Sequence, residues 1–245
     1  MGEPVRIQKL LSSWGIASRR AVEKMIDDGL VKVDGKTLFA QGTLIDPDNP
    51  PLITIDGKPV AKPVSNDYSI YVFNKPEWVV STMSDELGRK SVADFMPPGK
   101  RLYPVGRLDA DSTGILLITD YGELTNRLLH PSWKVEKEYV VKIAGGALDI
   151  SESERFCAGL ELEDGMTSPC ELVRLREPQT YSVVIREGKK RQVRRMFEVL
   201  GRKVVSLHRI RFGPLKLGTL KPGELRLLTP QEKAALLKAA GLPVD

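Results

Sequence analysis

The chain has 245 residues, of which 41% are hydrophobic and 28% are charged, with a net charge of +5. This length accommodates one medium domain and one small domain, and the composition is ordinary for a soluble globular protein. The sequence contains no apolar run of about 18 residues that would predict a membrane span, and its first residues do not predict a secretory signal. Two cysteines are too few for a zinc site or a disulfide framework, so we expect a reduced, cytoplasmic protein.

The N-terminal part of the chain predicts two helices and a hairpin. Apolar residues at helical spacing over residues 6–15 predict a first helix. Ser18 is a typical N-cap for a second helix over residues 19–28, and Asp34-Gly35 after the alternating residues 31–33 indicates a hairpin turn. Basic residues occupy early positions that we expect to be exposed, namely Arg6, Lys9, Arg19 and Arg20.

A proline-rich stretch separates these elements from the rest of the chain. Residues 46–66 hold five prolines, interrupted by a short predicted strand over residues 52–55 and an Asp56-Gly57 turn. We therefore place a linker at about residues 59–67, between a first domain at residues 4–62 and a second domain at residues 68–241.

The second domain contains many predicted strands and few helices. The strands are predicted over residues 68–73, 115–118, 139–143, 181–185, 204–211 and 225–228. Ser151 and Thr229 each begin a capping-box pattern, and the helices that they open end at Gly159 and Gly241. A third helix ends at Gly201 and carries one apolar face, formed by Val193, Met196, Phe197 and Leu200. We expect an α+β fold, with a small N-terminal α/β module followed by a mixed, mainly antiparallel sheet.

Positive charge is concentrated in this third helix and its surroundings. Residues 186–211 contain ten Lys or Arg and only two acidic residues. Such a local excess is typical of a surface that binds a phosphate backbone, although a solvated helix face is the alternative. Helical geometry turns Arg191 and Arg195 away from the apolar face and puts Arg194 at its flank, from which a side chain can reach a pocket.

The most informative stretch is residues 105–124, where a short polar loop precedes a buried strand. The loop contains Gly106-Arg107-Leu108-Asp109, and Gly114 then opens the apolar run over residues 115–118. Loops held by a rigid strand are favoured places for chemistry. The alternative is that Asp109 only caps a turn.

Four stretches, in this order along the chain, resemble the motifs of bacterial ribosomal pseudouridine synthases of the RsuA/RluB type. The motifs are Asn74-Lys75-Pro76 with Ser81-Thr82 and residues 85–89, then Gly106-Arg107-Leu108-Asp109, Lys137-Glu138-Tyr139 and residues 187–196. Residues 4–62 resemble the small RNA-binding module that this family shares with a ribosomal protein of the S-four type. The alternative for this module is a helical cap that packs on the main domain.

The resemblance implies roles for individual residues. Asp109 would be the catalytic nucleophile, with Arg194 as its charge partner and Arg191 as the second choice. Tyr139 would lie over a flipped uracil ring, although a strand-core aromatic is the alternative. Arg107 would occupy the space left by the flipped base or contact a phosphate. We expect further RNA contacts from the helix and the loop before it, at Lys189, Lys190, Arg191 and Arg195.

The resemblance also implies the reaction and its substrate. The enzyme would convert a specific uridine of ribosomal RNA, more likely of the large subunit, to pseudouridine, as a monomer and without a metal or cofactor. A non-catalytic RNA-binding factor for ribosome assembly, built from the same modules, is the alternative, and transfer RNA is a further candidate substrate. His130 and His208 have no placed Ser or Cys partner, so we expect structural or RNA-facing roles for them and no hydrolase triad.

Overall fold

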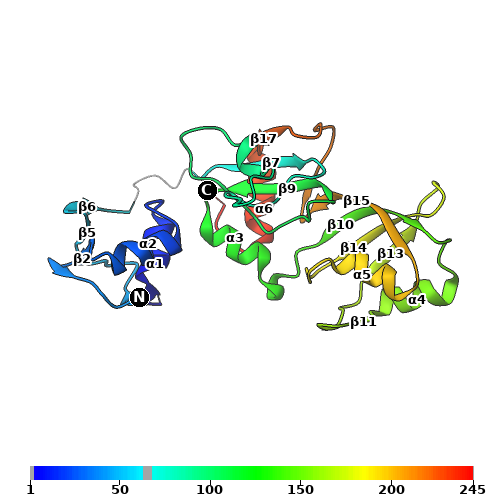
Figure 1. Ribbon diagram of the computed structural model, residues 1–245, viewed down its shortest axis with the longest axis horizontal. Coiled ribbons are helices and arrows are strands. Elements are labelled where there is room, and N and C mark those ends of the chain that lie inside the picture. The colour runs from blue at the N-terminus through cyan, green and yellow to red at the C-terminus, as the bar shows by residue number, and fades with distance from the viewer. Residues whose placement is uncertain (1–2, 63–67, 245) are drawn as a thin grey trace. The chain divides into compact units, whose positions relative to one another are not determined.

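A computed structural model describes residues 3–62 and 68–244 (Figure 1). Most of the predicted linker, residues 63–67, lies outside the described residues. By their internal contacts the residues form two compact units. The first comprises the chain up to Tyr68 together with Asp120–Glu123, and the second comprises Ser69–Thr119 and the chain from Leu124 onward.

The N-terminal unit packs two helices against short antiparallel strands. Its elements are β1 (Val5–Arg6), α1 (Ile7–Ser13), α2 (Arg19–Asp27), β2 (Val31–Val33), β3 (Lys36–Thr37), β4 (Leu44–Ile45), β5 (Ile53–Ile55) and β6 (Lys58–Val60). Strand β1 pairs with β4, and the other strands form one sheet in the order β3-β2-β5-β6. Its core gathers apolar side chains of both helices and of the sheet, including Ile7, Leu11, Val22, Ile26, Val31 and Ile53.

The structure confirms both predicted helices and the hairpin of this unit. The Ser18 hydroxyl accepts a hydrogen bond from the Ala21 N–H, which satisfies one of the free donors at the start of α2. Residues 58–60, of which the predicted linker included the last two, form β6 instead, because the Asp56-Gly57 turn folds them back onto β5. All four basic residues of the predicted RNA-binding set are exposed here: Arg6, Lys9, Arg19 and Arg20.

The second unit is built on a mixed sheet in the order β13-β14-β10-β15-β9-β7-β17, with β8 and β16 pairing at its side (Figure 1). Its strands are β7 (Ile70–Lys75), β8 (Tyr103–Pro104), β9 (Thr113–Thr119), β10 (Lys137–Ala144), β11 (Glu161–Leu162), β12 (Gly165–Met166), β13 (Glu171–Arg174), β14 (Thr180–Ile185), β15 (Lys203–Phe212), β16 (Leu215–Lys216) and β17 (Leu225–Leu227). The α-helices are α3 (Gly122–Leu129), α4 (Ile150–Ala158), α5 (Gln192–Val199) and α6 (Pro230–Ala239). In the main sheet only β9 and β15 pair in parallel, so the predicted mixed, mainly antiparallel fold is confirmed.

The helix starts of this unit follow local side-chain chemistry. Thr229 and Glu232 form the predicted capping box at the start of α6. The predicted box at Ser151 is wrong, because Asp149 and Glu152 exchange these hydrogen bonds and begin α4 earlier. Helix α4 ends at Gly159 as predicted.

A glycine permits the parallel contact at the centre of the sheet. Gly114 pairs with Arg209 of β15, and a Cβ atom at position 114 would collide with the backbone carbonyl of Arg209. Its φ of +106° is also a conformation that side-chain-bearing residues rarely adopt. The close approach places the start of β9, and the loop before it, beside Arg209.

Candidate active site

The loop that carries Asp109, residues 106–112, is braced by a buried lysine. Lys75 is fully buried at the end of β7, and its Nζ donates to the carbonyl oxygens of Pro76 and Val79, both at 2.8 Å, and of Ala110 at 3.4 Å. Burial lowers the pKa of Lys75 to about 8, although the nearby carboxylates oppose this shift. The lysine of the first motif therefore holds this loop in place.

Two further contacts tie this loop to the segment after β7. The Ser81 hydroxyl donates to the Leu108 carbonyl at 2.7 Å and accepts from the Leu108 N–H at 3.1 Å. The Trp78 N–H donates to the Ala110 carbonyl at 2.7 Å. The backbone on both sides of Asp109 is thus fixed, while its side chain remains 37% exposed.

Two arginines at the start of α5 face the carboxylates of the loop. Arg191 Nη1 lies 3.7 Å from Asp109 Oδ2, and the same guanidinium forms two hydrogen bonds with the Asp111 carboxylate, at 3.2 and 3.0 Å. Arg194 is buried and donates to the Asp111 backbone carbonyl at 2.7 Å and to the Val204 carbonyl at 3.3 Å. Burial raises the pKa of Asp111, but the hydrogen bond from Arg191 and the charges of both arginines hold it below its ordinary value.

These contacts correct the expected pairing of Asp109. We expected Arg194 as its first charge partner, but Asp109 forms its ion pair with Arg191. Arg191 precedes the first turn of α5 in a left-handed conformation, with φ of +50°, and is 40% exposed at its side chain. Arg194 is held by backbone carbonyls and reaches the loop through Asp111.

Asp109 lies at a cavity of about 550 Å³, a size suited to a small ligand or a single nucleotide. The apolar part of its lining comes from several elements, among them Leu128, Val135, Ile185, Val193 and Leu207. Its polar part includes Tyr139, two acidic residues, Asp109 and Glu187, and seven Lys or Arg, namely Arg107, Lys137, Arg186, Lys189, Lys190, Arg191 and Arg209. Cations therefore outnumber carboxylates around the cavity, which favours an anionic ligand such as a nucleotide.

Tyr139 lines this cavity beside a buried arginine. The two residues are register partners on β10 and β15, and the Tyr139 hydroxyl lies 3.5 Å from Arg209 Nη1. Arg209 Nε donates to the Ile115 carbonyl at 2.8 Å, whereas its buried Nη2 has no hydrogen-bond partner among the described residues. The sequence pattern places Arg209 only within the basic stretch, because its position opposite Tyr139 depends on an irregular strand register.

Lys137 adds a half-buried cation to the cavity. Its Nζ lies 3.3 Å from the carbonyl oxygens of Val135 and Glu187 and 5.8 Å from the centre of the Phe212 ring. Burial and, to a smaller extent, the charge of Arg209 lower the pKa of Lys137 to about 8, against the opposing effect of Glu187.

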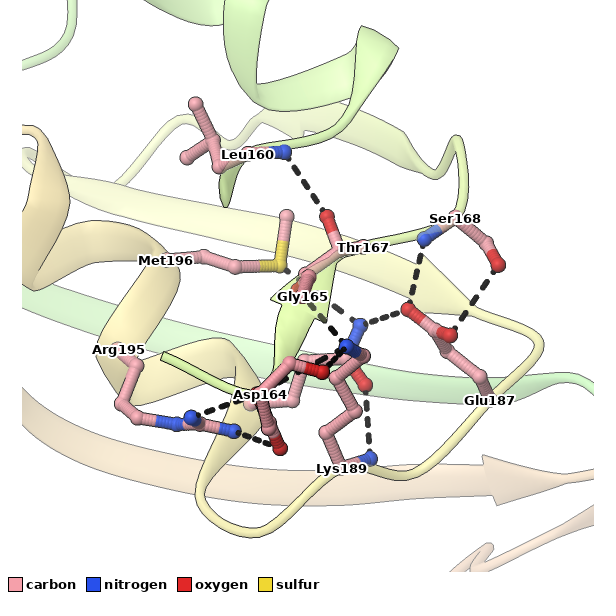
Figure 2. Close-up of polar contacts among 10 residues, drawn as sticks. Leu160, Asp164, Gly165, Thr167, Ser168, Glu187, Lys189, Arg195 and Met196 are labelled. Carbon is pink, nitrogen blue, oxygen red and sulfur yellow. Dashed lines mark hydrogen bonds and ion pairs between the residues drawn. The ribbon is translucent and has the colours of Figure 1, made fainter. Parts of the chain in front are cut away.

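The four basic residues predicted to bind RNA near α5 differ in their contacts. Lys189 Nζ donates to the Asp164 and Gly165 carbonyls, at 2.6 and 2.7 Å, and Arg195 forms two hydrogen bonds with the Asp164 carboxylate (Figure 2). These two cations therefore hold the turn between β11 and β12. Lys190 is exposed and forms no hydrogen bond or ion pair with another described residue, and the same is true of Arg107 in the Asp109 loop.

The loop before α5 is also fixed from its other side. The Glu187 carboxylate accepts hydrogen bonds from the Ser168 N–H at 2.8 Å, the Ser168 hydroxyl at 3.1 Å and the Gln192 side-chain amide at 2.6 Å (Figure 2). The loop that presents Lys190 and Arg191 to the cavity is thus held in one conformation by its neighbours.

Both histidines form hydrogen bonds within the protein. His208 Nδ1 lies 2.8 Å from the Thr113 hydroxyl, and burial lowers the pKa of His208. His130 caps a short 3₁₀ turn, Pro131–Trp133, through the Ser132 N–H. Within the described ranges, no group of three or more His, Cys, Asp or Glu side chains is arranged to ligate a metal ion. None of the helices in residues 3–62 and 68–244 has both the length and the apolar character of a membrane-crossing helix.

Comparison with known proteins assigns the chain to a family. The family model of RNA pseudouridylate synthases matches residues 69–199, which is more than half of the chain and includes Asp109, Tyr139 and α5. The chain belongs to the RNA pseudouridylate synthase family. The S4 domain model matches residues 5–47 in the N-terminal unit.

Similar proteins cover nearly the whole chain. An uncharacterized RNA pseudouridine synthase of Aquifex aeolicus is 40% identical over 97% of this chain and 96% of its own. The ribosomal large subunit pseudouridine synthase B of Bacillus subtilis is 38% identical over 93% of both chains. A crystal structure of a pseudouridylate synthase shares 29% identity and a TM-score of 0.69, over 95% of this chain and 99% of the other.

Proposed function

We propose that this pseudouridine synthase acts on a specific uridine of ribosomal RNA, and that Asp109 is its essential catalytic group. The observation that carries the proposal is the position of Asp109, which lies on a loop with a fixed backbone at a cavity lined by Tyr139 and several cations. The relative from Bacillus subtilis is named as a large-subunit enzyme, which supports the large-subunit RNA as substrate.

The reaction is an isomerisation in which atoms and electrons balance within the nucleotide. The bond between N1 of uracil and C1′ of ribose breaks, the base turns, and C5 forms the new bond to C1′. C5 loses a proton and N1 gains one, so the reaction needs no electron donor or acceptor. We propose that the ionised Asp109 is the nucleophile of this sequence and that no cofactor takes part.

The surrounding residues would orient the base and maintain the charge of Asp109. Tyr139 presents a ring on which uracil can stack and a hydroxyl that can move a proton. Arg191 pairs with Asp109 directly, and Arg194 acts as a positioning residue through Asp111. We also propose that the enzyme acts as a monomer.

RNA binding would combine exposed cations with extrusion of the target base. A paired base must leave its stack to reach Asp109, at a cost of a few kcal/mol that binding energy must supply. Arg107 and Lys190 line the cavity with their charges free, which suits phosphate contacts. Exposed cations of the S4 domain would add to this binding, at Arg6, Lys9, Arg19 and Arg20.

The substitution Asp109→Asn tests the assignment. Asparagine keeps the shape of the side chain but is neither an anionic nucleophile nor a base, so product formation should fall below a few per cent of wild type. The melting temperature and the RNA affinity should change little, because the backbone contacts of the loop are retained. Higher residual turnover would refute the role of Asp109.

A non-catalytic assembly factor is the competing function. Mapping pseudouridine in ribosomal RNA from cells with and without the gene separates the two. Our proposal predicts at least one uridine that is modified only when the gene is present, and restoration by wild type but not by Asp109→Asn. A modification map that does not change with the gene would favour the assembly factor.

A further inference from the structure

The side chain of an exposed tryptophan beside the Asp109 loop takes part in none of the contacts described so far. The Trp78 side chain is 70% exposed, although tryptophan is usually well buried. Its backbone is left-handed, with φ of +61°, a conformation in which a bulky residue is an outlier and which glycine adopts at little cost. A large aromatic side chain thus occupies a position where both its exposure to solvent and its left-handed backbone are unfavourable.

The surrounding contacts hold Trp78 in this conformation. The Trp78 N–H donates a hydrogen bond to the Ala110 carbonyl. The next residue, Val79, has a buried side chain, and its carbonyl accepts a hydrogen bond from Lys75. Val80 then bridges to Ser91. Backbone strain that is fixed in this way is concentrated at functional sites in proteins.

The position of Trp78 indicates what it contacts. Its backbone is bonded to the residue that follows Asp109, and Ser81 of the same segment is bonded to the residue that follows Arg107. An aromatic face and a free cation therefore lie on two segments that hydrogen bonds tie together. Proteins that bind single-stranded RNA use this combination, in which cations contact the backbone and aromatic rings stack on the bases.

We propose that the Trp78 indole is a binding site for an unpaired nucleobase of the RNA substrate that flanks the target uridine. This inference rests on the proposed function, since it assumes that RNA approaches the Asp109 cavity. Stacking requires only the flat face of a base, so the site would tolerate any of the four bases. Its contribution would hold the RNA segment beside the cavity after the target base has left its stack.

Binding of a single-stranded oligouridylate, measured over a range of salt concentrations, tests the proposal. We expect Trp78→Ala to weaken binding roughly 5- to 150-fold at every salt concentration, the effect of losing one stacked base. The slope of log affinity against log salt should not change, because the indole carries no charge. Lys190→Gln should instead flatten the slope by roughly 0.7, as expected when one phosphate of a single strand is no longer neutralised. Trp78→Phe should retain most of the affinity.

Two control variants separate binding from folding. Val173→Ala removes an apolar side chain on β13 that is 59% exposed but has no aromatic face. It should leave the affinity within about twofold of wild type, as for a surface side chain away from such features. Trp78→Gly should lose as much affinity as Trp78→Ala, yet melt about 2–4 °C higher than Trp78→Ala, because glycine relieves the left-handed backbone. A variant that is more stable but binds RNA less well cannot owe its defect to unfolding.

The possible outcomes decide between the explanations. If Trp78→Ala and Trp78→Gly bind the oligonucleotide as tightly as wild type does, the indole contacts something other than RNA and the inference is overturned. If their affinity falls and the salt slope also flattens, the stacking role is overturned. If wild type does not bind RNA at all, both the inference and the proposed function are refuted, whereas a failure of Asp109→Asn alone to lose turnover affects only the catalytic assignment.

Discussion

Replacing Lys75 by methionine should remove a pH dependence of stability that one buried amine produces. The pKa of Lys75 is lowered from 10.5 to about 8 in the folded protein by burial. Below pH 8 both folded and unfolded chains bind the proton, and the cost of the buried charge is fully present. Between pH 8 and pH 10.5 the unfolded chain keeps its proton while the folded chain has released it, so the free energy of unfolding rises with pH.

The magnitude follows from these two pKa values. From pH 7 to pH 9 the free energy of unfolding of wild type should rise by about 1.3 kcal/mol through Lys75 alone. Methionine at position 75 binds no proton, so the difference in stability between wild type and Lys75→Met should change by this amount. Other groups with shifted pKa values, such as Lys137 and Cys170, are present in both proteins, so their contributions cancel in the difference.

Urea unfolding at pH 7, 8 and 9, followed by circular dichroism, measures this difference. Lys90→Met, which removes an exposed lysine from the same part of the chain, is the matched control. Its free energy of unfolding should change with pH by the same amount as that of wild type. We also expect Lys75→Met to lose at least tenfold in turnover, because the brace on the Asp109 loop is gone and small misplacements of catalytic groups are costly. A stability difference that stays constant from pH 7 to pH 9 would refute the reasoning.

Two further predictions concern the cations. Arg191→Ala should lower turnover at least tenfold, since Asp109 loses the ion pair at 3.7 Å, whereas a larger defect in Arg194→Lys would return the main role to Arg194. Replacing the four exposed cations of the S4 domain together by glutamine should weaken RNA binding and flatten the salt slope by roughly 0.7–0.9 for each phosphate that the domain no longer neutralises. An unchanged slope would indicate that this domain does not bind the RNA backbone.

Features that depend on a few neighbouring residues were predictable from sequence. The cap at Ser18 and the box at Thr229 were confirmed because each is decided within one helical turn. The predicted start of α4 was wrong, because Asp149 and Ser151 are both good N-cap residues with an acidic residue three positions later. Only the path of the preceding chain decides between them.

Features of the site that depend on packing were not predictable. Nothing in the local pattern indicates that Lys75 lies fully buried under the Asp109 loop or that Arg209 faces Tyr139, since both follow from the sheet. The pairing of Asp109 with Arg191 instead of Arg194 likewise depends on how α5 meets the loop. The residue types and their order were enough to identify the motif positions, but they did not indicate which charged side chains form ion pairs.

The parallel contact of β9 with β15 also has a consequence for how the enzyme folds. It joins residues 95 apart in the chain, where Thr113 meets His208 and Gly114 meets Arg209. Contacts between such distant residues form late, because the intervening chain loses entropy before the contact stabilises it. β9, which follows the Asp109 loop, pairs with β7 nearby in sequence, whereas Tyr139 and Arg209 belong to strands beyond this junction. The cavity is therefore complete only after β9 has paired with β15. A chain in which the strands on one side of this pairing have folded already has secondary structure but no active site.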